Sequence, residues 1–279
     1  MKQTRVQSAD GLTLAVCESG NPTGPAILFL HGFNQAALCW HLQMEDPALC
    51  ARFRMVAYDI RGHGASDQPD DPARYGRDED FAADTQAVIV ALGLHRPVLV
   101  GWSYAGRLIN DYVRHHGTTA LGGINYVGAR LDSDPAFNGP GNEVFRDMIR
   151  GDLDREIVAV EKFLRACFFL PPPEKTLKRA SYYNMRVTPR TRRAHLTRPA
   201  DDGAVLATLN LPVLLTQGSR DLLVLPGLAT ARAKIIPGAE LSIYHGIGHM
   251  PFAEDVPRFN RELAAFVTRC ATTTATTPA

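Results

Sequence analysis

Ser103 stands where a buried strand would turn into a helix. Residues 98–100 are a short apolar run typical of a buried strand, and residues 104–115 carry apolar side chains at helical spacing. Gly101 and Ala105 flank Ser103 two positions to either side, where a sharp turn would leave no room for larger side chains. This is the nucleophile-elbow pattern G-x-S-x-G with alanine in place of the last glycine. It predicts a serine hydroxyl raised clear of the strand ends.

Later loops supply a base and an acid for this serine. A serine hydroxyl is a poor nucleophile unless a base removes its proton and a third group orients that base. His249 lies in a glycine-flanked loop after the strand-like run 241–244, and Asp221 follows the strand-like run 213–216. We therefore expect a catalytic triad of Ser103 as nucleophile, His249 as base and Asp221 as orienting acid.

Each residue of this triad also has an ordinary structural interpretation. A Gly-Ser pair can simply turn the chain, a loop aspartate can cap a helix, and a loop histidine can bond to the backbone. Four other acids compete with Asp221: Asp132 and Asp134 after the strand-like run 123–127, and Glu254 and Asp255 after the histidine.

Acyl transfer places negative charge on an oxygen, which needs preorganised donors. The run "ILFLHGFNQ" ends a predicted strand in His31-Gly32-Phe33, a loop type that contributes one backbone N–H to an oxyanion hole. We expect the N–H groups of Phe33 and Tyr104 to form this hole, and His31 to brace the loop.

These residues need a sheet to bring them together. Eight strand-like runs follow one another at 5–7, 12–17, 26–30, 55–59, 98–101, 123–127, 213–216 and 241–244. The first two form a predicted hairpin, and several later ones alternate with helical patterns at 80–92, 104–115 and 258–268. This alternation predicts an α/β fold with a mostly parallel eight-stranded sheet and an antiparallel start.

The alternation stops between residues 131 and 206. Prolines and four helical patterns fill this segment, at 142–150, 154–169, 174–186 and 189–197. We expect a helical cap at 131–206, a core of 1–130 and 207–270, and a flexible tail at 271–279.

Composition narrows the class of protein. The 279 residues are 45% hydrophobic and carry 30 basic against 29 acidic side chains, a balance that disfavours nucleic acid and anionic membranes as partners. No signal-like or membrane-spanning run is present, so a cytoplasmic protein is expected. Five cysteines without C-x-x-C spacing indicate reduced thiols. We expect no metal and no cofactor, and the composition leaves the oligomeric state open.

The chain resembles the α/β-hydrolase superfamily from about residue 12 to residue 267. The resemblance lies in "HGF" at 31–33, "YDIRGHGASD" at 58–67, "GWSYAG" at 101–106, "GSRDLLV" at 218–224 and "GHMPFAED" at 248–255. It implies the order serine, acid, histidine and a structural role for the loop at 61–64. Within the superfamily the chain is similar to capped esterases, lactonases and cofactor-free haloperoxidases. Serine at the elbow departs from haloalkane dehalogenases and epoxide hydrolases, which use aspartate there.

These observations favour hydrolysis of a small to medium carboxylic ester or lactone through an acyl-enzyme. Carbon–carbon bond hydrolysis, perhydrolysis and a ligand receptor on the same fold are the alternatives. Aromatic side chains near the elbow and in the cap, Trp102, Phe163 and Phe168 among them, predict a largely apolar pocket. Arginines of the cap are expected to be solvated, so a neutral small-molecule substrate is predicted.

Overall fold

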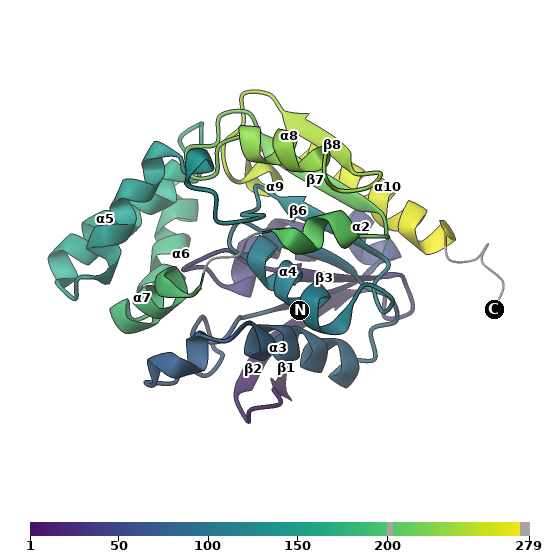
Figure 1. Ribbon diagram of the computed structural model, residues 1–279, viewed down its shortest axis with the longest axis horizontal. Helices are drawn as coiled ribbons and strands as arrows, with labels where there is room; N and C mark the ends of the chain where they lie inside the picture. The colour runs from purple at the N-terminus through teal and green to yellow at the C-terminus, as the bar shows by residue number, and fades with distance from the viewer. Residues whose placement is uncertain (200–202, 274–279) are drawn as a thin grey trace.

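One sheet of eight strands forms the centre of the computed structural model, which describes residues 1–199 and 203–273. The strands lie in the order β1-β2-β4-β3-β5-β6-β7-β8 (Figure 1). Their bounds are β1 Lys2–Gln7, β2 Thr13–Gly20, β3 Ala26–Leu30, β4 Arg54–Tyr58, β5 Val98–Trp102, β6 Gly123–Val127, β7 Val213–Gly218 and β8 Glu240–Tyr244. Strand β2 pairs antiparallel with β1 and β4, and all other pairs are parallel. The predicted sheet is confirmed.

Helices cover both faces of this sheet. Val98 of β5 pairs with Gly123 of β6, and because side chains alternate along a strand, Gly101 and Gly123 face opposite sides. A Cβ on Gly101 would lie 2.5 Å from Ile109 of helix α4 (Ala105–His116), and one on Gly123 would lie 3.3 Å from Phe266 of helix α10 (Val256–Thr273). Strands β3, β5 and β6 are therefore buried throughout, which explains their mostly apolar spelling.

The α-helices outside the segment between β6 and β7 are α1 His41–Met44, α2 Pro47–Arg52, α3 Asp78–Ala91, α4 Ala105–His116, α8 Gly227–Ala233, α9 Pro251–Glu254 and α10 Val256–Thr273. Of these, α3, α4 and α10 correspond to the predicted helical patterns, and the short α1, α2, α8 and α9 were not predicted. Short 3₁₀ helices lie at Ala37–Trp40 and Pro72–Tyr75. Helix α10 continues to Thr273, into the predicted tail that begins at residue 271, and residues 274–279 lie outside the described part of the chain.

The segment between β6 and β7 is helical, as its spelling predicts. It contains α5 Leu153–Ala166, α6 Glu174–Met185 and α7 Pro189–Thr197, which gather on the left of Figure 1, with 3₁₀ helices at Pro135–Phe137, Pro140–Ile149 and Ala204–Thr208. The predicted α-helix at 142–150 is the 3₁₀ helix η4, Pro140–Ile149. Near its start, the N–H groups of Gly139 and Gly141 donate to the carbonyls of Leu223 and Leu222, outside this helix. The division into core and cap stays a prediction.

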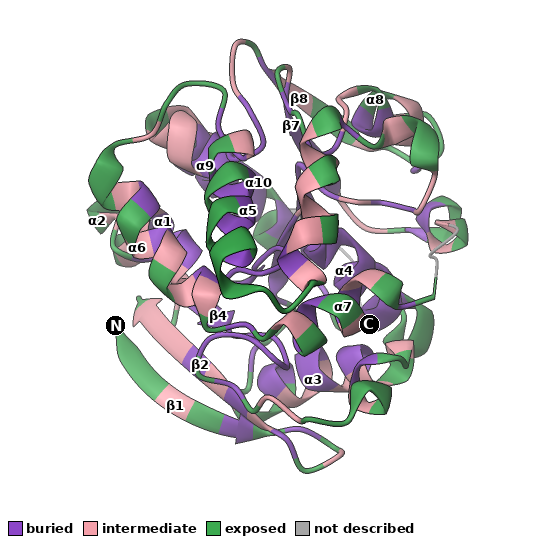
Figure 2. Cartoon of the chain, turned by 90° about the vertical axis from the view of Figure 1, so that its left-hand side faces the viewer, coloured by how far each residue is buried: buried purple, intermediate pink, exposed green. Residues whose placement is uncertain are grey.

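Helix α5 shows how this segment packs. Its buried residues recur every three or four positions, at Glu156, Ala159, Val160, Phe163 and Leu164. Figure 2 looks onto the outer, exposed side of this helix. The helix therefore presents an apolar stripe to the rest of the protein with one carboxylate, Glu156, inside it.

Arg192 on α7 neutralises that carboxylate. Its Nη1 lies 3.1 Å from Oε2 of Glu156, and its Nε donates to Oδ1 of Asn34 at 2.9 Å. Further bonds reach the carbonyls of Met148 and Asn184. One buried guanidinium thus joins η4, α5, α6 and α7 to the loop after β3, and the expectation that cap arginines are solvated is wrong for this residue.

Arg198, just after α7, is also buried and also paired with a carboxylate. Its guanidinium forms an ion pair with Asp111 of α4 and donates to the hydroxyl of Tyr104 at 3.3 Å. A buried charge is stable only when it is paired. Arg192 and Arg198 are both paired with a buried carboxylate, so both stabilise the packing of this helical segment.

The loop after β4 is structural, as the resemblance implies. Arg61 is fully buried and donates to both carboxylate oxygens of Asp84 at 2.7 Å.

All five cysteines are free thiols. Across the described residues, the helices are too short or too polar to cross a membrane.

We predict that Arg192→Leu lowers the free energy of unfolding by about 3–5 kcal/mol, because Glu156 is left charged and buried without its partner. Urea unfolding measures this loss. Arg190→Leu, at an exposed position of the same helix, is the matched control and should change stability by about 0.5 kcal/mol or less. The double variant Arg192→Leu/Glu156→Leu should regain part of the loss. Equal stability of Arg192→Leu and the control would contradict the structural role of this pair.

Candidate active site

Ser103 has a left-handed backbone, with φ of 57°, between the end of β5 and the start of α4. This conformation is strained by about 1–2 kcal/mol for a residue with a Cβ. Three hydrogen bonds maintain it: Ser103 N–H donates to the carbonyl of Val127 at 3.0 Å, and its own carbonyl accepts from Gly106 at 3.0 Å and Arg130 at 2.9 Å. The predicted strand-to-helix corner is therefore present.

Small residues make this corner possible. A Cβ on Gly101 would lie 3.2 Å from the carbonyl oxygen of Ala105 as well as against Ile109. A Cβ on Gly32 would lie 3.2 Å from that of Ser103. The loop after β3 therefore runs directly beside the serine.

His249 and Asp221 form a buried pair. Nδ1 of His249 lies 2.6 Å from Oδ2 of Asp221, and the two side chains are almost fully buried. The other carboxylate oxygen accepts the N–H groups of Leu223 at 2.8 Å and Val224 at 2.9 Å, and Gln217 donates to Oδ2 at 2.9 Å. The carboxylate is thus fixed as an acceptor, which places the imidazole proton on Nδ1 and leaves Nε2 free to accept one.

The end of β6 brings this pair beside the serine. Val127, the last residue of β6, accepts the N–H of Ser103. The next residue is Gly128, where a Cβ would lie 3.1 Å from Nδ1 of His249 and 3.4 Å from Oδ2 of Asp221. The three residues of the predicted triad therefore surround the carboxyl end of one strand.

The loop of His249 is held from two sides. Nε1 of Trp102, the residue before the serine, donates to the carbonyl of His249 at 2.9 Å. The N–H of His249 donates to the carbonyl of Cys167 at the end of α5, at 3.0 Å. Glu254 reinforces this junction by accepting the N–H groups of Phe169 at 2.8 Å and Gly248 at 2.9 Å.

The competing acids have other partners. Asp132 and Asp134 both pair with Arg232, and Glu254 accepts the backbone bonds just described. Asp255 accepts the N–H of Arg258 at the start of α10. The structure therefore brings Asp221 to His249 and gives the other four acids different partners.

A cavity of about 420 Å³ opens onto Ser103. Its walls come from the elbow, from the loops after β3, β6 and β7, and from η4, α5 and α7. The residues that line it are Phe33, Ser103, Tyr104, Arg107, Arg130, Ser133, Asn138, Asn142, Phe145, Phe163, His195, Leu196, Leu223 and Val224. Phe163 thus lies where the sequence places it. Trp102 does not line this cavity, because its ring packs against His249 and Phe252. Phe168 lines a different cavity.

Comparison with known proteins identifies the family. The sequence profile of the Alpha/beta hydrolase family matches residues 27–262. The chain belongs to the alpha/beta hydrolase family. Its fold and its similarity to esterases of this family confirm the resemblance inferred from its motifs.

Two solved structures resemble this alpha/beta hydrolase over nearly its whole length. A Burkholderia cenocepacia protein provisionally named an aryl esterase is 33% identical, with a TM-score of 0.93, and the match covers 97% of this chain and 100% of that one. The esterase RhEst1 of Rhodococcus sp. ECU1013 is 30% identical, with a TM-score of 0.89 and coverage of 96% and 99%.

Among curated proteins, the non-heme chloroperoxidase CPO-A1 of Kitasatospora aureofaciens is 30% identical over 88% of this chain and 93% of its own length. Longer mycobacterial relatives are 33% identical over 54% of this chain, and the match spans 24% of their length.

The oxyanion hole expected in this alpha/beta hydrolase involves Phe33 and Tyr104. Gly32 lies against Ser103, and Tyr104 directly follows it. Within residues 1–199 and 203–273, neither the Phe33 N–H nor the Tyr104 N–H has a hydrogen-bond partner. Both groups are therefore available to an oxygen bound next to the serine, and their catalytic role stays a prediction.

Two other histidines near the site have both ring nitrogens occupied. His31 donates from Nδ1 to the carbonyl of Gly32 at 2.8 Å and accepts the N–H of Ile60 at 3.0 Å, so it braces the loop. His195 donates to the carbonyl of Arg61 and accepts the hydroxyl of Tyr104. Burial lowers the pKa of His31, and burial lowers the pKa of His195 to about 3, so both are neutral at physiological pH.

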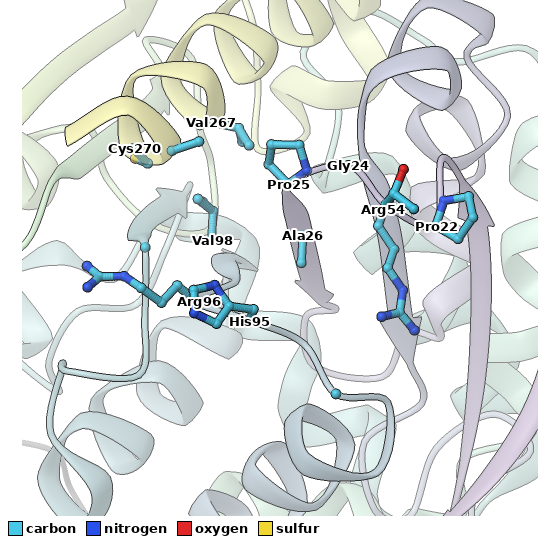
Figure 3. Close-up of a pocket in the computed structure, with 14 residues that line it drawn as sticks. Pro22, Gly24, Pro25, Ala26, Arg54, His95, Arg96, Val98, Val267 and Cys270 are labelled. Carbon is cyan, nitrogen blue, oxygen red and sulfur yellow. The ribbon is translucent and has the colours of Figure 1, made fainter. Parts of the chain in front are cut away.

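A second cavity, of about 380 Å³, lies at the opposite end of the strands (Figure 3). Ala26 and Val98, the first residues of β3 and β5, line it together with Val267 and Cys270 of α10. Because Ser103 follows the last residue of β5, this hollow is remote from the elbow and contains none of the predicted triad.

Arg107 and Arg130 are among the residues of the cavity at Ser103 that sequence reasoning missed. The positions of these two arginines could have predicted their place in the cavity. Arg107 lies one helical turn after Ser103, and Arg130 follows β6, the strand beside the elbow strand.

We predict that Ser103→Gly is more stable than Ser103→Ala by about 1 kcal/mol, because glycine adopts a positive φ without strain. Urea unfolding of the two variants measures the difference. At Ser181, inside α6, the same two substitutions should rank in the reverse order by about 1 kcal/mol, because alanine favours a helix. The same ranking at both positions would contradict a strained turn at Ser103.

Proposed function

We propose that this protein is a serine hydrolase that cleaves a small to medium carboxylic ester or lactone through an acyl-enzyme. The observation that carries this proposal is the buried bond of 2.6 Å between His249 and Asp221, beside a serine held at φ of 57°. A neutral imidazole with its Nδ1 proton fixed is a base ready to accept a proton at Nε2.

In the first half of the reaction, Oγ of Ser103 attacks the carbonyl carbon while Nε2 of His249 takes the hydroxyl proton. Asp221 stabilises the imidazolium that forms, and the N–H groups of Phe33 and Tyr104 bind the oxyanion. When the carbon–oxygen bond of the ester breaks, His249 gives its proton to the departing alcohol oxygen. The product is an acyl-enzyme on Ser103.

In the second half, His249 removes a proton from water, which attacks the acyl carbon. The bond to Ser103 breaks, its Oγ regains the proton, and the carboxylic acid leaves. For a lactone the alcohol and acid belong to one molecule, so the alcohol stays attached until this step.

Similarity supports the ester and lactone class. The Burkholderia and Rhodococcus structures, at 33% and 30% identity, carry the name esterase and align with nearly the whole chain. The cavity of about 420 Å³ suits a small acyl group, with Phe33, Phe145 and Phe163 as apolar walls.

A second candidate, perhydrolysis, is supported by the Kitasatospora relative, whose name is non-heme chloroperoxidase. In this reaction hydrogen peroxide replaces water in the second half. His249 removes a proton from the peroxide, the peroxide oxygen attacks the acyl carbon, and Ser103 leaves with a peracid as product. The same residues thus serve both reactions, and the choice depends on the acceptor.

We predict that Ser103→Ala folds normally and loses nearly all turnover of a chromogenic ester such as p-nitrophenyl butyrate, by several orders of magnitude. A fluorophosphonate probe should label Ser103 in the unaltered protein, as peptide mass spectrometry would show. Ser181→Ala, a half-buried serine of α6, is the control and should keep both activity and labelling. Turnover by Ser103→Ala at the level of the control would refute the mechanism.

A separate measurement decides the acceptor. We predict that the acyl-enzyme hydrolyses with water in the absence of peroxide, and that added hydrogen peroxide yields peracid only if perhydrolysis operates. Trapping the peracid with a thioether and quantifying the sulfoxide gives the partition between water and peroxide. A partition no greater than uncatalysed peracid formation would remove the second candidate and leave the first unaffected.

A further inference from the structure

Two arginines lie in the wall of the cavity that opens onto Ser103. Arg107 extends from α4, one turn after the serine, and Arg130 follows the end of β6. The N–H of Arg130 donates to the carbonyl of Ser103 at 2.9 Å, so the two backbones are in direct contact. A group bound to these guanidiniums would therefore lie close to the nucleophile.

Both guanidiniums have unused donors. Arg130 donates from Nη2 to the carbonyl of Asp134 at 2.9 Å, yet its Nη1 is buried without a hydrogen-bond partner in the described structure. Arg107 is 8% exposed and donates from Nη2 to the carbonyl of Pro199, and its Nε is likewise buried without a partner there. Buried donors of a charged group are costly to leave unpaired.

No described carboxylate forms an ion pair with either arginine. The acids that act on Arg130 are Asp132 and Asp134, and both pair with Arg232. Burial lowers the pKa of Arg130, and the charge of Arg107 lowers it further. The described lining of the cavity thus contains two positive charges and no negative one.

The rest of the cavity differs in character. Phe33 packs edge to face against Phe145 and Phe163 on one side, and the rings of Phe145 and Phe163 are tilted against each other, with ring centroids 5.3 to 6.2 Å apart. Leu223 and Val224 extend the apolar lining. A fitting occupant therefore has an apolar part and a negatively charged part.

We propose that Arg107 and Arg130 bind a carboxylate of the substrate, so that the preferred ester or lactone carries a free carboxylate a few bonds from the carbonyl attacked by Ser103. A planar carboxylate matches the fork of donors on an arginine, and it would pair with the two cationic side chains that line the cavity. The inference rests on the proposed ester hydrolysis and specifies its substrate. It differs from the neutral substrate expected from the sequence. That expectation took account only of the arginines of the cap, and neither Arg107 nor Arg130 is one of them.

The test compares half-esters with diesters. Monomethyl and dimethyl esters of succinic, glutaric and adipic acid share one scissile bond type and differ in one carboxylate, at three chain lengths. The unaltered protein should hydrolyse one half-ester with a higher kcat/KM than its diester. Arg130→Gln should lower kcat/KM for that half-ester by about 10- to 100-fold, mainly through KM, and change the diester little.

Two further variants sharpen the result. Arg193→Gln, at an exposed arginine of α7 outside the cavity, is the matched control and should keep the preference for the half-ester. Arg107→Lys keeps the positive charge in the buried position and should reduce the preference through loss of the planar fork. Thermal unfolding confirms that each variant is folded before its kinetics are compared.

The possible failures are distinguishable. Preference of the unaltered protein for the diesters, or an equal loss for both ester types in Arg130→Gln, would overturn the carboxylate site while Ser103-dependent hydrolysis kept the proposed function. If no ester is hydrolysed, the proposed function fails, and titration calorimetry with glutarate tests the site alone. Binding that disappears in Arg130→Gln and persists in Arg193→Gln supports the site, and absence of binding overturns it.

Discussion

The left-handed turn at Ser103 is the constraint on which the site depends. A serine prefers other backbone conformations, so the turn exists only because the neighbouring strand holds it. Val127 of β6 accepts the N–H of Ser103, and the N–H of Arg130, after β6, donates to the carbonyl of Ser103. The close approach of Gly32 completes the enclosure. Since the same strand end also borders His249 and Asp221, any shift of β6 against β5 would disturb Ser103, His249 and Asp221 together.

Buried polar groups determine how the helical segment sits on the sheet. Arg192 joins four helical elements to the loop after β3, and Arg198 joins the end of α7 to α4 through Asp111. Paired charges in an apolar contact tolerate few alternative arrangements, because each misplacement leaves a charge without a partner. The aromatic walls of the cavity contribute buried apolar area, whereas these ion pairs fix the orientation of the helical segment on the sheet.

Local sequence was sufficient for the central strands, which are mostly apolar runs between turn residues, and for placing Ser103, Asp221 and His249 just beyond strand ends. It was insufficient where the outcome depends on packing between distant segments. Nothing in the spelling of α1, His41–Met44, marks a helix of one turn. Trp102 was expected in the pocket because it adjoins the serine, yet alternation along β5 turns its ring toward Phe252. Arg192 was expected in solvent because no local pattern reveals Glu156 opposite it.

The bonds between the end of α5 and the histidine loop bear on how such proteins can be recombined. The carbonyl of Cys167 holds the backbone of His249, and Glu254 holds the N–H groups of Phe169 and Leu170. Residues 167–170 therefore support His249, the proposed base, although they belong to the helical segment between β6 and β7. A chimera that exchanges the whole segment between β6 and β7 with that of a relative would also exchange the support of His249. Grafts confined to α6 and α7 would keep that support, and they would also need to keep Arg192 and Asn184, which bind Asn34 in the loop after β3.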